Sequence, residues 1–530
     1  MDTMFKVKRL LFILLTLLPL AASAQECRVR RGDCLPAGPV ADGAQHRAPV
    51  MRRLPRPNTK WDKNKTYKQL VILMSFSDVQ FRSENPKETY NNILNKPGYN
   101  EMNGPGCMAD YFRDQSGGLL NLSFDIYGPY QVDAVAQLPN SDENTKRHGP
   151  SEFREATMKF LQENPDIDLS VYDWDGNGYV NQVIYIFAGY TGNQNSAKSY
   201  GCIWPSTSTF STITHNGLKI SNYTSSSELW VNGRSCGIGT MSHEFSHSLG
   251  LPDIYPVTTD ETMPYSMVDE WDLMDGGNFT NYGWCPPNFT SLEKWLLGWQ
   301  EFTELTESTT VSGMKSVADG GVVYQIKHND NEFLLLENRQ WKGWDADLPG
   351  QGLVIFHVNY NSSSWTSNAV NSTKNAPRFS IIPADNMNFD AWNDRLVALR
   401  DAGKLNNQYR DDNHRHSLYM SSAPYPWSTD STTFVNDELT STSTPASTML
   451  TNNSEGKNVL MKPITNIKMT SDGLISFDFM GGSSTDIVTV KSDNQRREVF
   501  DLSGRRVETM TNGRVYIVRE KDGTIKRVIY

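Results

Sequence analysis

The chain has 530 residues and a formal net charge of −10 at pH 7, with 60 acidic residues against 50 lysines and arginines. This acidic balance disfavours nucleic acid as a partner, because phosphate backbones are bound by clustered cations. The length exceeds what one hydrophobic core usually supports, so we expect at least two domains.

The first 24 residues are typical of a cleaved secretory signal peptide. Lys6, Lys8 and Arg9 precede an apolar run over residues 10–20, and small residues follow at 22–24. The run is too short for a good membrane span, and no later segment approaches spanning length. We therefore expect an exported protein without a transmembrane segment, either secreted or held at the cell surface.

Residues 25–65 are rich in Arg, Pro and Gly and show no apolar period, which indicates a linker or a short pro-segment. Six cysteines in an exported chain permit disulfides, but the sequence does not fix their pairing. Cys27 and Cys34 lie in this segment and could close a local loop. A thiolate from either could also block a zinc site, although a disulfide or a flexible tether is the simpler interpretation.

The following region alternates between strand and helix patterns. Residues 67–78 form an apolar, β-rich run that predicts a buried strand opening the first domain. Residues 107–118 predict a helix ended by glycines, and residues 119–130 predict a second strand. Residues 151–164 predict a helix over the sheet, with Ser151 as its cap and four apolar positions at Phe153, Met158, Phe160 and Leu161.

A loop before the next predicted strand, residues 183–190, has oxygen-bearing residues at alternate positions, as in a calcium-binding loop. Gly178 stands at position six, where a sharp turn is needed, but position twelve is Ile184, which excludes a helical EF-hand. A strand-entry Ca²⁺ loop and a turn held by its own side-chain hydrogen bonds both fit the pattern. The candidate Ca²⁺ ligands are Asp173, Asp175, Asn177, the carbonyl of Tyr179, and Asn181.

Residues 191–234 are polar and loop-like, and we expect them to form the rim of a substrate cleft. The next segment, residues 239–249, predicts a helix on which His243 and His247 are four apart and share one face. Two imidazoles in this arrangement can bind one Zn²⁺ ion. Glu244 beside them is placed to act as a general base toward a zinc-activated water. The combination is typical of a metallopeptidase centre.

The chain after this helix contains further candidate site residues. Gly250 is expected to end the helix with a positive φ and turn the chain back toward the metal. Asp253 follows as the candidate third Zn²⁺ ligand, and Pro252 stiffens the returning segment. Met274 stands in a short turn, where a methionine can give ligating histidines an apolar, polarisable floor. An ordinary core position is the alternative for Met274.

Residues 288–299 predict a short amphipathic helix that closes the first domain. Short apolar runs separated by polar turns then predict a mainly β region over residues 301–482, which either completes or flanks the catalytic domain. Long loops are expected over residues 362–453. His357 and Glu337 lie between apolar strand residues and are interpreted as hydrogen-bonded core residues rather than ligands.

Several segments carry a family resemblance. HEFSHSLGLPDIY is followed by WDLMDGG and KWLLGW, and LVILMSFSD, MADYFRDQSGG, DGNG, FLLLENRQ and GWDADLPGQGLVIFHVN occur elsewhere. Together they resemble the immune inhibitor A type of secreted zinc endopeptidases, which belong to the metzincin clan. The resemblance implies an α/β (α+β) metzincin-like catalytic domain over residues 66–300 that hydrolyses internal peptide bonds.

The resemblance also implies roles for individual residues. His243 and His247 match the ligand histidines, Glu244 matches the general base, and Met274 matches a Met-turn. Asp253 matches the position where metzincin-like sites place their third ligand. Some zinc peptidases use a more distant glutamate instead, and Glu293 is then the rival. Many metzincins have a tyrosine two residues after the Met-turn methionine; Gly276 stands there in this chain, and the nearest substitute is Tyr282.

Residues 486–530 follow a GGSSTD linker and contain DLSGRRV and GRVYIV. They resemble the C-terminal sorting domain of proteins exported by the type IX secretion system, which implies a small β module that contacts that machinery. The alternative is a β module added for stability.

The sequence therefore predicts a secreted zinc endopeptidase that acts on extracellular proteins or peptides, with Zn²⁺ and a candidate Ca²⁺ as cofactors. The alternative is a surface adhesion or binding protein that retains a peptidase-like fold without activity. Damage to the ligand set or the base would favour the alternative, and none is visible in the sequence.

Overall fold

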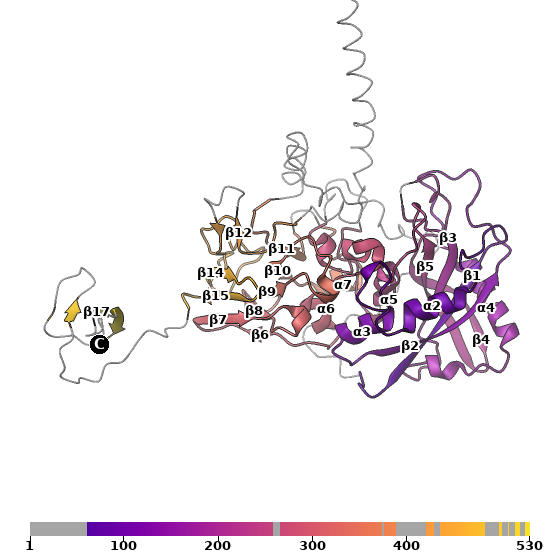
Figure 1. Ribbon diagram of the computed structural model, residues 1–530, viewed down its shortest axis with the longest axis horizontal. Coiled ribbons are helices and arrows are strands. Elements are labelled where there is room, and N and C mark those ends of the chain that lie inside the picture. Colours follow the sequence, from indigo (N-terminus) through magenta and orange to yellow (C-terminus); the bar gives the residue numbers. More distant parts are fainter. Residues whose placement is uncertain are drawn as a thin grey trace, which may run out of the picture.

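The computed structural model describes residues 61–194, 196–257, 266–373, 376–387, 420–428, 435–482, 498–500, 507, 515–519 and 525–529. Two blocks lie side by side (Figure 1): one is built on strands β1 to β5, and the other on strands β6 to β15. The predicted signal peptide and most of both residues 25–65 and the GGSSTD linker lie outside the described residues. The fold is thus a mixed α/β structure with several sheets.

The first sheet has five strands in the order β2-β1-β3-β5-β4. Strands β1, β2, β3 and β5 run parallel to their neighbours, and β4 pairs antiparallel with β5 at the edge. The strands are β1 (Thr66–Ser75), β2 (Asn121–Gln131), β3 (Val183–Tyr190), β4 (Thr207–His215) and β5 (Leu218–Leu229).

Side-chain alternation along β1 divides the core of this block into two faces. Leu70 and Ile72 pack on the face covered by α4, whereas Val71 and Leu73 pack on the face that carries α2, α3 and α5. This is the period-2 geometry of a strand buried on both sides. The helices are α2 (Pro86–Asn95), α3 (Met108–Gln115), α4 (Pro150–Glu163) and α5 (Gly239–Leu249).

The expectation of a loop over residues 191–234 is wrong, because β4 and β5 form a long hairpin there. Asn216 and Gly217 turn the hairpin with φ values of 49° and 84°, the left-handed conformation that an Asn-Gly turn provides. The strands were missed because serine and threonine replace the apolar residues, although Ser225 and Ser226 are fully buried.

Helix α4 also differs from its prediction at the cap. Gly149, with φ of 68°, occupies the N-cap position, and Pro150 is the first helical residue, so Ser151 is inside the helix. Met158 is 37% exposed rather than part of the core. Proline at the first turn pre-sets the helical φ and explains why the helix begins before Ser151.

The second block is mainly β. One sheet has the order β11-β10-β9-β8-β6, and a second has the order β14-β15-β7. These sheets contain β6 (Thr303–Glu304), β7 (Thr309–Met314), β8 (Tyr324–Lys327), β9 (Glu332–Arg339), β10 (Gly352–Asn359), β11 (Phe379–Ile381), β14 (Ile464–Met469) and β15 (Ile475–Phe479). Shorter elements are α6 (Ser291–Leu296), α7 (Ser362–Thr366), β12 (Trp427–Ser428) and β13 (Val435–Asn436).

Strand β9 connects the two blocks through its two faces. Leu335 and Phe333 join the hydrophobic core that includes Phe245 of α5, whereas Leu334 and Leu336 pack in the core beneath β14 and β15. Because β9 is buried on both faces, the β region shares a core with the helix that carries the candidate site.

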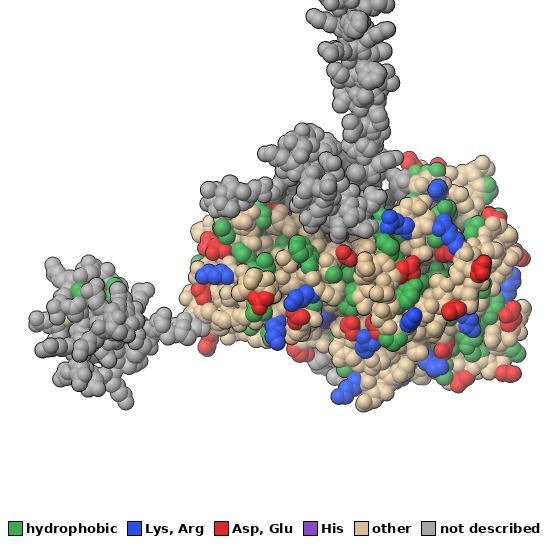
Figure 2. Space-filling model, in the orientation of Figure 1, with side chains coloured by type: hydrophobic (Ala, Val, Ile, Leu, Met, Phe, Trp, Pro, Cys, Tyr) green, Lys and Arg blue, Asp and Glu red, His purple; other side chains and the backbone are tan. Residues whose placement is uncertain are grey.

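Several short 3₁₀ helices complete the described chain: Glu101–Asn103, Leu169–Tyr172, Asp269–Trp271, Gly276–Gly283, Val317–Asp319 and Gly343–Asp345. A separate antiparallel sheet contains β16 (Glu498–Phe500), β17 (Val515–Arg519) and β18 (Ile525–Ile529). Among the described residues, no helix combines the length and apolar character needed to cross a bilayer. On the face in view, acidic and basic side chains are intermixed (Figure 2).

Candidate metal centre

Helix α5 is held in place at both of its ends. At its start, a Cβ on Gly239 would collide with the carbonyl of Asn278, so only glycine permits this close approach. At its end, Gly250 has φ of 113°, and its N–H donates to the carbonyls of Ser246 and His247 at 3.2 and 3.1 Å. The predicted helix end is therefore present, and the chain reverses after it.

Both histidines of α5 have one ring nitrogen fixed by a backbone carbonyl. Nδ1 of His243 donates to the carbonyl of Leu273 at 2.9 Å, and Nδ1 of His247 donates to that of Leu251 at 2.8 Å. Since a carbonyl can only accept, these contacts place a proton on Nδ1 and leave Nε2 as the nitrogen that can bind a metal ion when it carries no proton. Ligating histidines in metal sites are held in this way.

Asp253 brings an oxygen to both of these nitrogens. Its Oδ1 lies 3.2 Å from Nε2 of His243 and 3.3 Å from Nε2 of His247. Asp253 is 1% exposed, and Oδ1 has no hydrogen-bond partner. Two nitrogens and one buried carboxylate oxygen thus converge, and such a donor set fits a Zn²⁺ ion.

The electrostatics of the three groups are strongly linked. Burial by itself raises the pKa of Asp253, but His247 and His243 lower it far below its usual value, so the carboxylate is charged. Burial lowers the pKa of His247, yet the Asp253 carboxylate outweighs this and raises it to about 9. The negative charge of Asp253 therefore favours a cation between these side chains, which a metal ion can supply in place of a proton.

Glu244 lies beside the histidines on the same helix. One ligand atom from each of His243, Glu244 and His247 lies within 4.8 Å of the others. The Glu244 carbonyl accepts from Oγ1 of Thr207 on β4 at 2.5 Å, which places the edge strand against α5. The Glu244 side chain is half-buried and adjacent to the convergent nitrogens.

The turn around Met274 contacts His243 and the segment that follows α5. Leu273 supplies the carbonyl that orients His243, and the Met274 carbonyl accepts from the N–H of Ile254 at 2.9 Å. The Met274 side chain is fully buried. The turn thus orients one histidine and anchors the segment that carries Asp253.

The two alternative residues named from the resemblance have other contacts. Oε2 of Glu293 accepts from the N–H and Oγ1 of Thr290 at 2.9 and 3.0 Å, which caps α6. The Tyr282 ring is covered by the guanidinium of Arg234 at 4.5 Å. Tyr255, in contrast, stacks on His243 at 6.3 Å between ring centroids. Sequence reasoning missed Tyr255, although it ends the motif segment quoted for the resemblance.

The candidate calcium loop bonds to itself. The Asp173 carboxylate accepts from the N–H groups of Asn177 and Gly178 at 3.1 and 2.9 Å. Oδ1 of Asn177 accepts from the N–H of Tyr179 at 2.9 Å, and Asn181 accepts from Trp174 at 2.6 Å. Asp175 accepts from the Asn177 side chain at 3.1 Å. These contacts support the self-bonded turn, and a Ca²⁺ ion there stays a prediction.

Two residues interpreted as core positions are confirmed in that role. Nε2 of His357 lies 2.7 Å from the carboxylate of Glu332, and both are buried. Glu337 accepts from Ser291 and pairs with Arg339. The cysteines within the described residues are free, buried thiols: Cys107, Cys202, Cys236 and Cys285.

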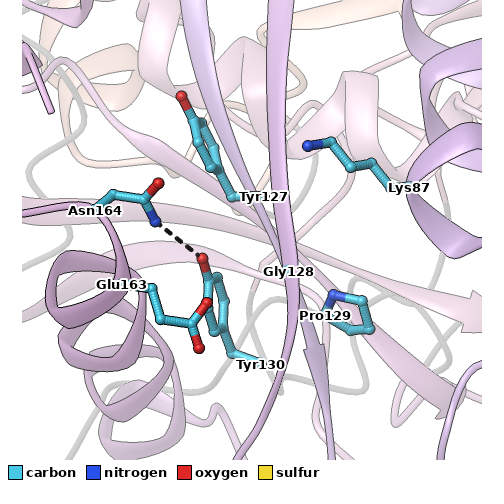
Figure 3. A pocket seen from close by; sticks show the side chains of 7 residues that line it. All are labelled: Lys87, Tyr127, Gly128, Pro129, Tyr130, Glu163 and Asn164. Atoms are coloured by element: carbon cyan, nitrogen blue, oxygen red, sulfur yellow. Dashed lines mark hydrogen bonds between the residues drawn. The ribbon is translucent and has the colours of Figure 1, made fainter.

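A hollow elsewhere on the molecule lies beside β2 and the ends of α2 and α4 (Figure 3). Asn164 donates to the hydroxyl of Tyr130 at 3.3 Å within it. None of the predicted site residues lines this hollow, so it is separate from the candidate metal centre. Its lining residues are Lys87, Tyr127, Gly128, Pro129, Tyr130, Glu163 and Asn164.

Comparison with known proteins places this geometry in context. Residues 57–298 match the family model of the immune inhibitor A peptidase M6, catalytic domain. Immune inhibitor A of Bacillus thuringiensis subsp. alesti is 24% identical over 311 residues, which cover 48% of this chain and 43% of the relative. The pre-pro-metalloprotease PrtV of Vibrio cholerae serotype O1 (strain M66-2) is 22% identical over 270 residues, or 46% of this chain and 28% of the relative. The chain spans less than half the length of these relatives, and the matches support a metallopeptidase.

Proposed function

We propose that the M6-type catalytic region makes this chain a secreted zinc endopeptidase that hydrolyses internal peptide bonds of extracellular proteins. The observation that carries the proposal is the convergence of Nε2 of His243, Nε2 of His247 and Oδ1 of Asp253. In this proposal the three side chains hold the metal in a metzincin-like site, and the Met274 turn is its Met-turn.

When bound, a zinc ion polarises the scissile carbonyl and makes a water acidic enough to attack near neutral pH. Glu244 accepts the proton of the attacking water and passes it to the nitrogen of the leaving amine. Leu273 and Leu251 hold the histidine rings so that both Nε2 atoms lie near Oδ1 of Asp253, where they would bind the metal. Asp253 adds the negative charge that favours a divalent cation at this position.

Replacement of the general base tests this assignment. We expect the Glu244→Ala and Glu244→Gln variants to retain folding and one zinc per chain while losing cleavage of an unfolded protein substrate. Glu155→Gln is a matched control, since Glu155 lies on α4, on the opposite face of the sheet, and pairs with Lys159. Cleavage-site profiling with a peptide mixture would give the specificity. Continued cleavage by both Glu244 variants would overturn the assignment of the base.

The adhesion alternative requires a damaged ligand set, whereas the donor atoms of His243, His247 and Asp253 are all present and oriented. A purified protein that takes up no stoichiometric zinc, and gains no activity from added zinc, would favour adhesion. Export through the signal peptide and the type IX machinery stays a prediction on residues 1–24 and 486–530.

A further inference from the structure

The carboxylate of Asp253 is held by a residue far along the chain. Nδ2 of Asn368 donates to Oδ2 of Asp253 at 2.6 Å, and Oδ1 of Asn368 accepts from the N–H of Asp253 at 2.6 Å. One amide side chain therefore makes two hydrogen bonds to one residue, with its donor on the carboxylate and its acceptor on the backbone. Asn368 lies just after α7, outside the segment that matches the peptidase family.

The bond from Nδ2 of Asn368 decides which oxygen of Asp253 is left for a metal. Oδ2 is occupied by Asn368, whereas Oδ1 is buried, has no hydrogen-bond partner, and faces both histidine Nε2 atoms. An aspartate that is hydrogen-bonded both at one carboxylate oxygen and at its backbone N–H has lost most of its rotational freedom. Contacts of this kind orient metal ligands and typically account for roughly 10- to 100-fold in metal affinity.

The backbone of Asn368 matches this role. Its φ is 55°, in the left-handed region that asparagine tolerates better than most residues. Two nearby residues bind the segment that contains Asp253. Nδ2 of Asn371 donates to the carbonyl of Ile254 at 2.8 Å, and Oγ of Ser372 accepts from the N–H of Val257 at 3.2 Å. The segment with Asp253 thus lies between the Met274 turn and residues 368–372.

We propose that Asn368 is a positioning residue that orients Asp253, the third zinc ligand. This inference rests on the proposed function, because it assigns part of the same centre to the mainly β region. The catalytic unit then extends beyond residue 300 to at least residue 372.

The test uses the full chain with two substitutions of different character. Asn368→Gly removes both hydrogen bonds while permitting the left-handed backbone. Asn368→Asp keeps the shape but sets a second carboxylate against Oδ2 of Asp253. Zinc affinity is measured by competition with a chromophoric chelator, together with the thermal midpoint of the metal-free protein. We expect a roughly 10- to 100-fold loss of zinc affinity in Asn368→Gly and a larger loss in Asn368→Asp.

Asn361→Ala is the matched control. Asn361 caps α7, the helix just before Asn368, by accepting from the N–H of Ser364 at 3.0 Å. Its loss should lower the thermal midpoint while leaving zinc affinity unchanged. An equal loss of affinity in Asn361→Ala would show a general effect of α7 and would overturn the positioning role.

A double substitution separates a direct effect from one through Asp253. In an Asp253→Ala background, Asn368→Gly should produce no further loss of affinity, since its target is gone. Additive losses would contradict the inference. Wild-type zinc affinity in both Asn368 variants would also contradict it while leaving the proposed function intact, whereas a wild-type chain that binds no zinc would refute the proposed function itself.

Discussion

Oδ1 of Asp253 lies 3.2 Å from Nε2 of His243, and the opposite nitrogen of that imidazole is bonded to the carbonyl of Leu273. The histidine is therefore held from one side by the Met274 turn and faces a buried carboxylate on the other. Substitution of Asp253 and of its rival Glu293 should therefore have clearly different effects on zinc binding.

The first prediction concerns Asp253 and its rival. Asp253→Asn should lower zinc affinity by more than about 100-fold, since even outer contacts to a ligand are worth roughly 10- to 100-fold. Glu293→Gln should leave zinc affinity unchanged, because a glutamine can still accept the capping bonds from Thr290. Chelator competition on both variants measures this. A loss of zinc in the Glu293 variant alone would make Glu293 the ligand.

The second prediction concerns removal of the metal. A chelator should abolish peptide hydrolysis and lower the thermal midpoint, and added Zn²⁺ should restore both. At a free zinc concentration about 1,000 times the dissociation constant, the expected stabilisation is about 4 kcal/mol. Magnesium serves as the control ion, because it prefers oxygen ligands in octahedral geometry and should restore neither property. Full hydrolysis by a protein shown to be zinc-free would contradict the assignment of a zinc centre to His243, His247 and Asp253.

The third prediction concerns the buried Arg339, which ends β9 and contacts the segment before α6. Arg339 is fully buried, pairs with Asp345 at 2.7 Å and donates to the carbonyl of Asn288 at 3.1 Å. Arg339→Ala should cost roughly 3–5 kcal/mol, because it leaves buried carboxylates without their cation. Lys342→Ala is the control, since the Lys342–Asp319 pair is exposed and should contribute less than about 1 kcal/mol. Urea denaturation compares the two variants, and equal small effects would disprove the role of Arg339.

The fourth prediction is a loss of stability in acid. Burial raises the pKa of Glu332, but hydrogen bonds from His357, Thr451 and the N–H of Leu450 outweigh it and lower the pKa to about 2. In the unfolded chain the pKa of this carboxyl is near its ordinary value. The contribution of Glu332 to the free energy of unfolding is therefore complete above about pH 4.5 and disappears as the pH falls toward about 2. Its size is roughly 3 kcal/mol.

Unfolding of Glu332→Gln measures that contribution. The variant should be less stable than the wild type near pH 6, and the difference should shrink as the pH falls from about 4.5 to about 2. Glu304→Gln is the control, because Glu304 forms a half-exposed pair with Lys327. A difference that stays constant across this acid range would show that the charge of Glu332 is not responsible.

Local pattern was sufficient to predict much of this chain. Helix α5 (residues 239–249) and strand β3 (residues 183–190) have the predicted bounds. The first is marked by the i, i+4 spacing of its histidines and by Gly250 at its end, and the second by a run of apolar residues. The i, i+4 spacing of His243 and His247 already places both on one helix face, which is a property of helix geometry alone. The sequence by itself therefore determined the helix, its two histidines and the neighbouring Glu244.

Tertiary structure decided the contacts between distant segments. The sequence offers Asp253 as a ligand by its place after the helix, and Glu293 only through the family resemblance; the fold brings Asp253 to the histidines and gives Glu293 to the cap of α6. Asn368 lies 115 residues from Asp253 and belongs to no motif. The β4 and β5 strands also needed the fold, because their serines and threonines are buried by neighbours rather than by their own hydrophobicity. Contacts across such separations depend on chain packing, which no local period encodes.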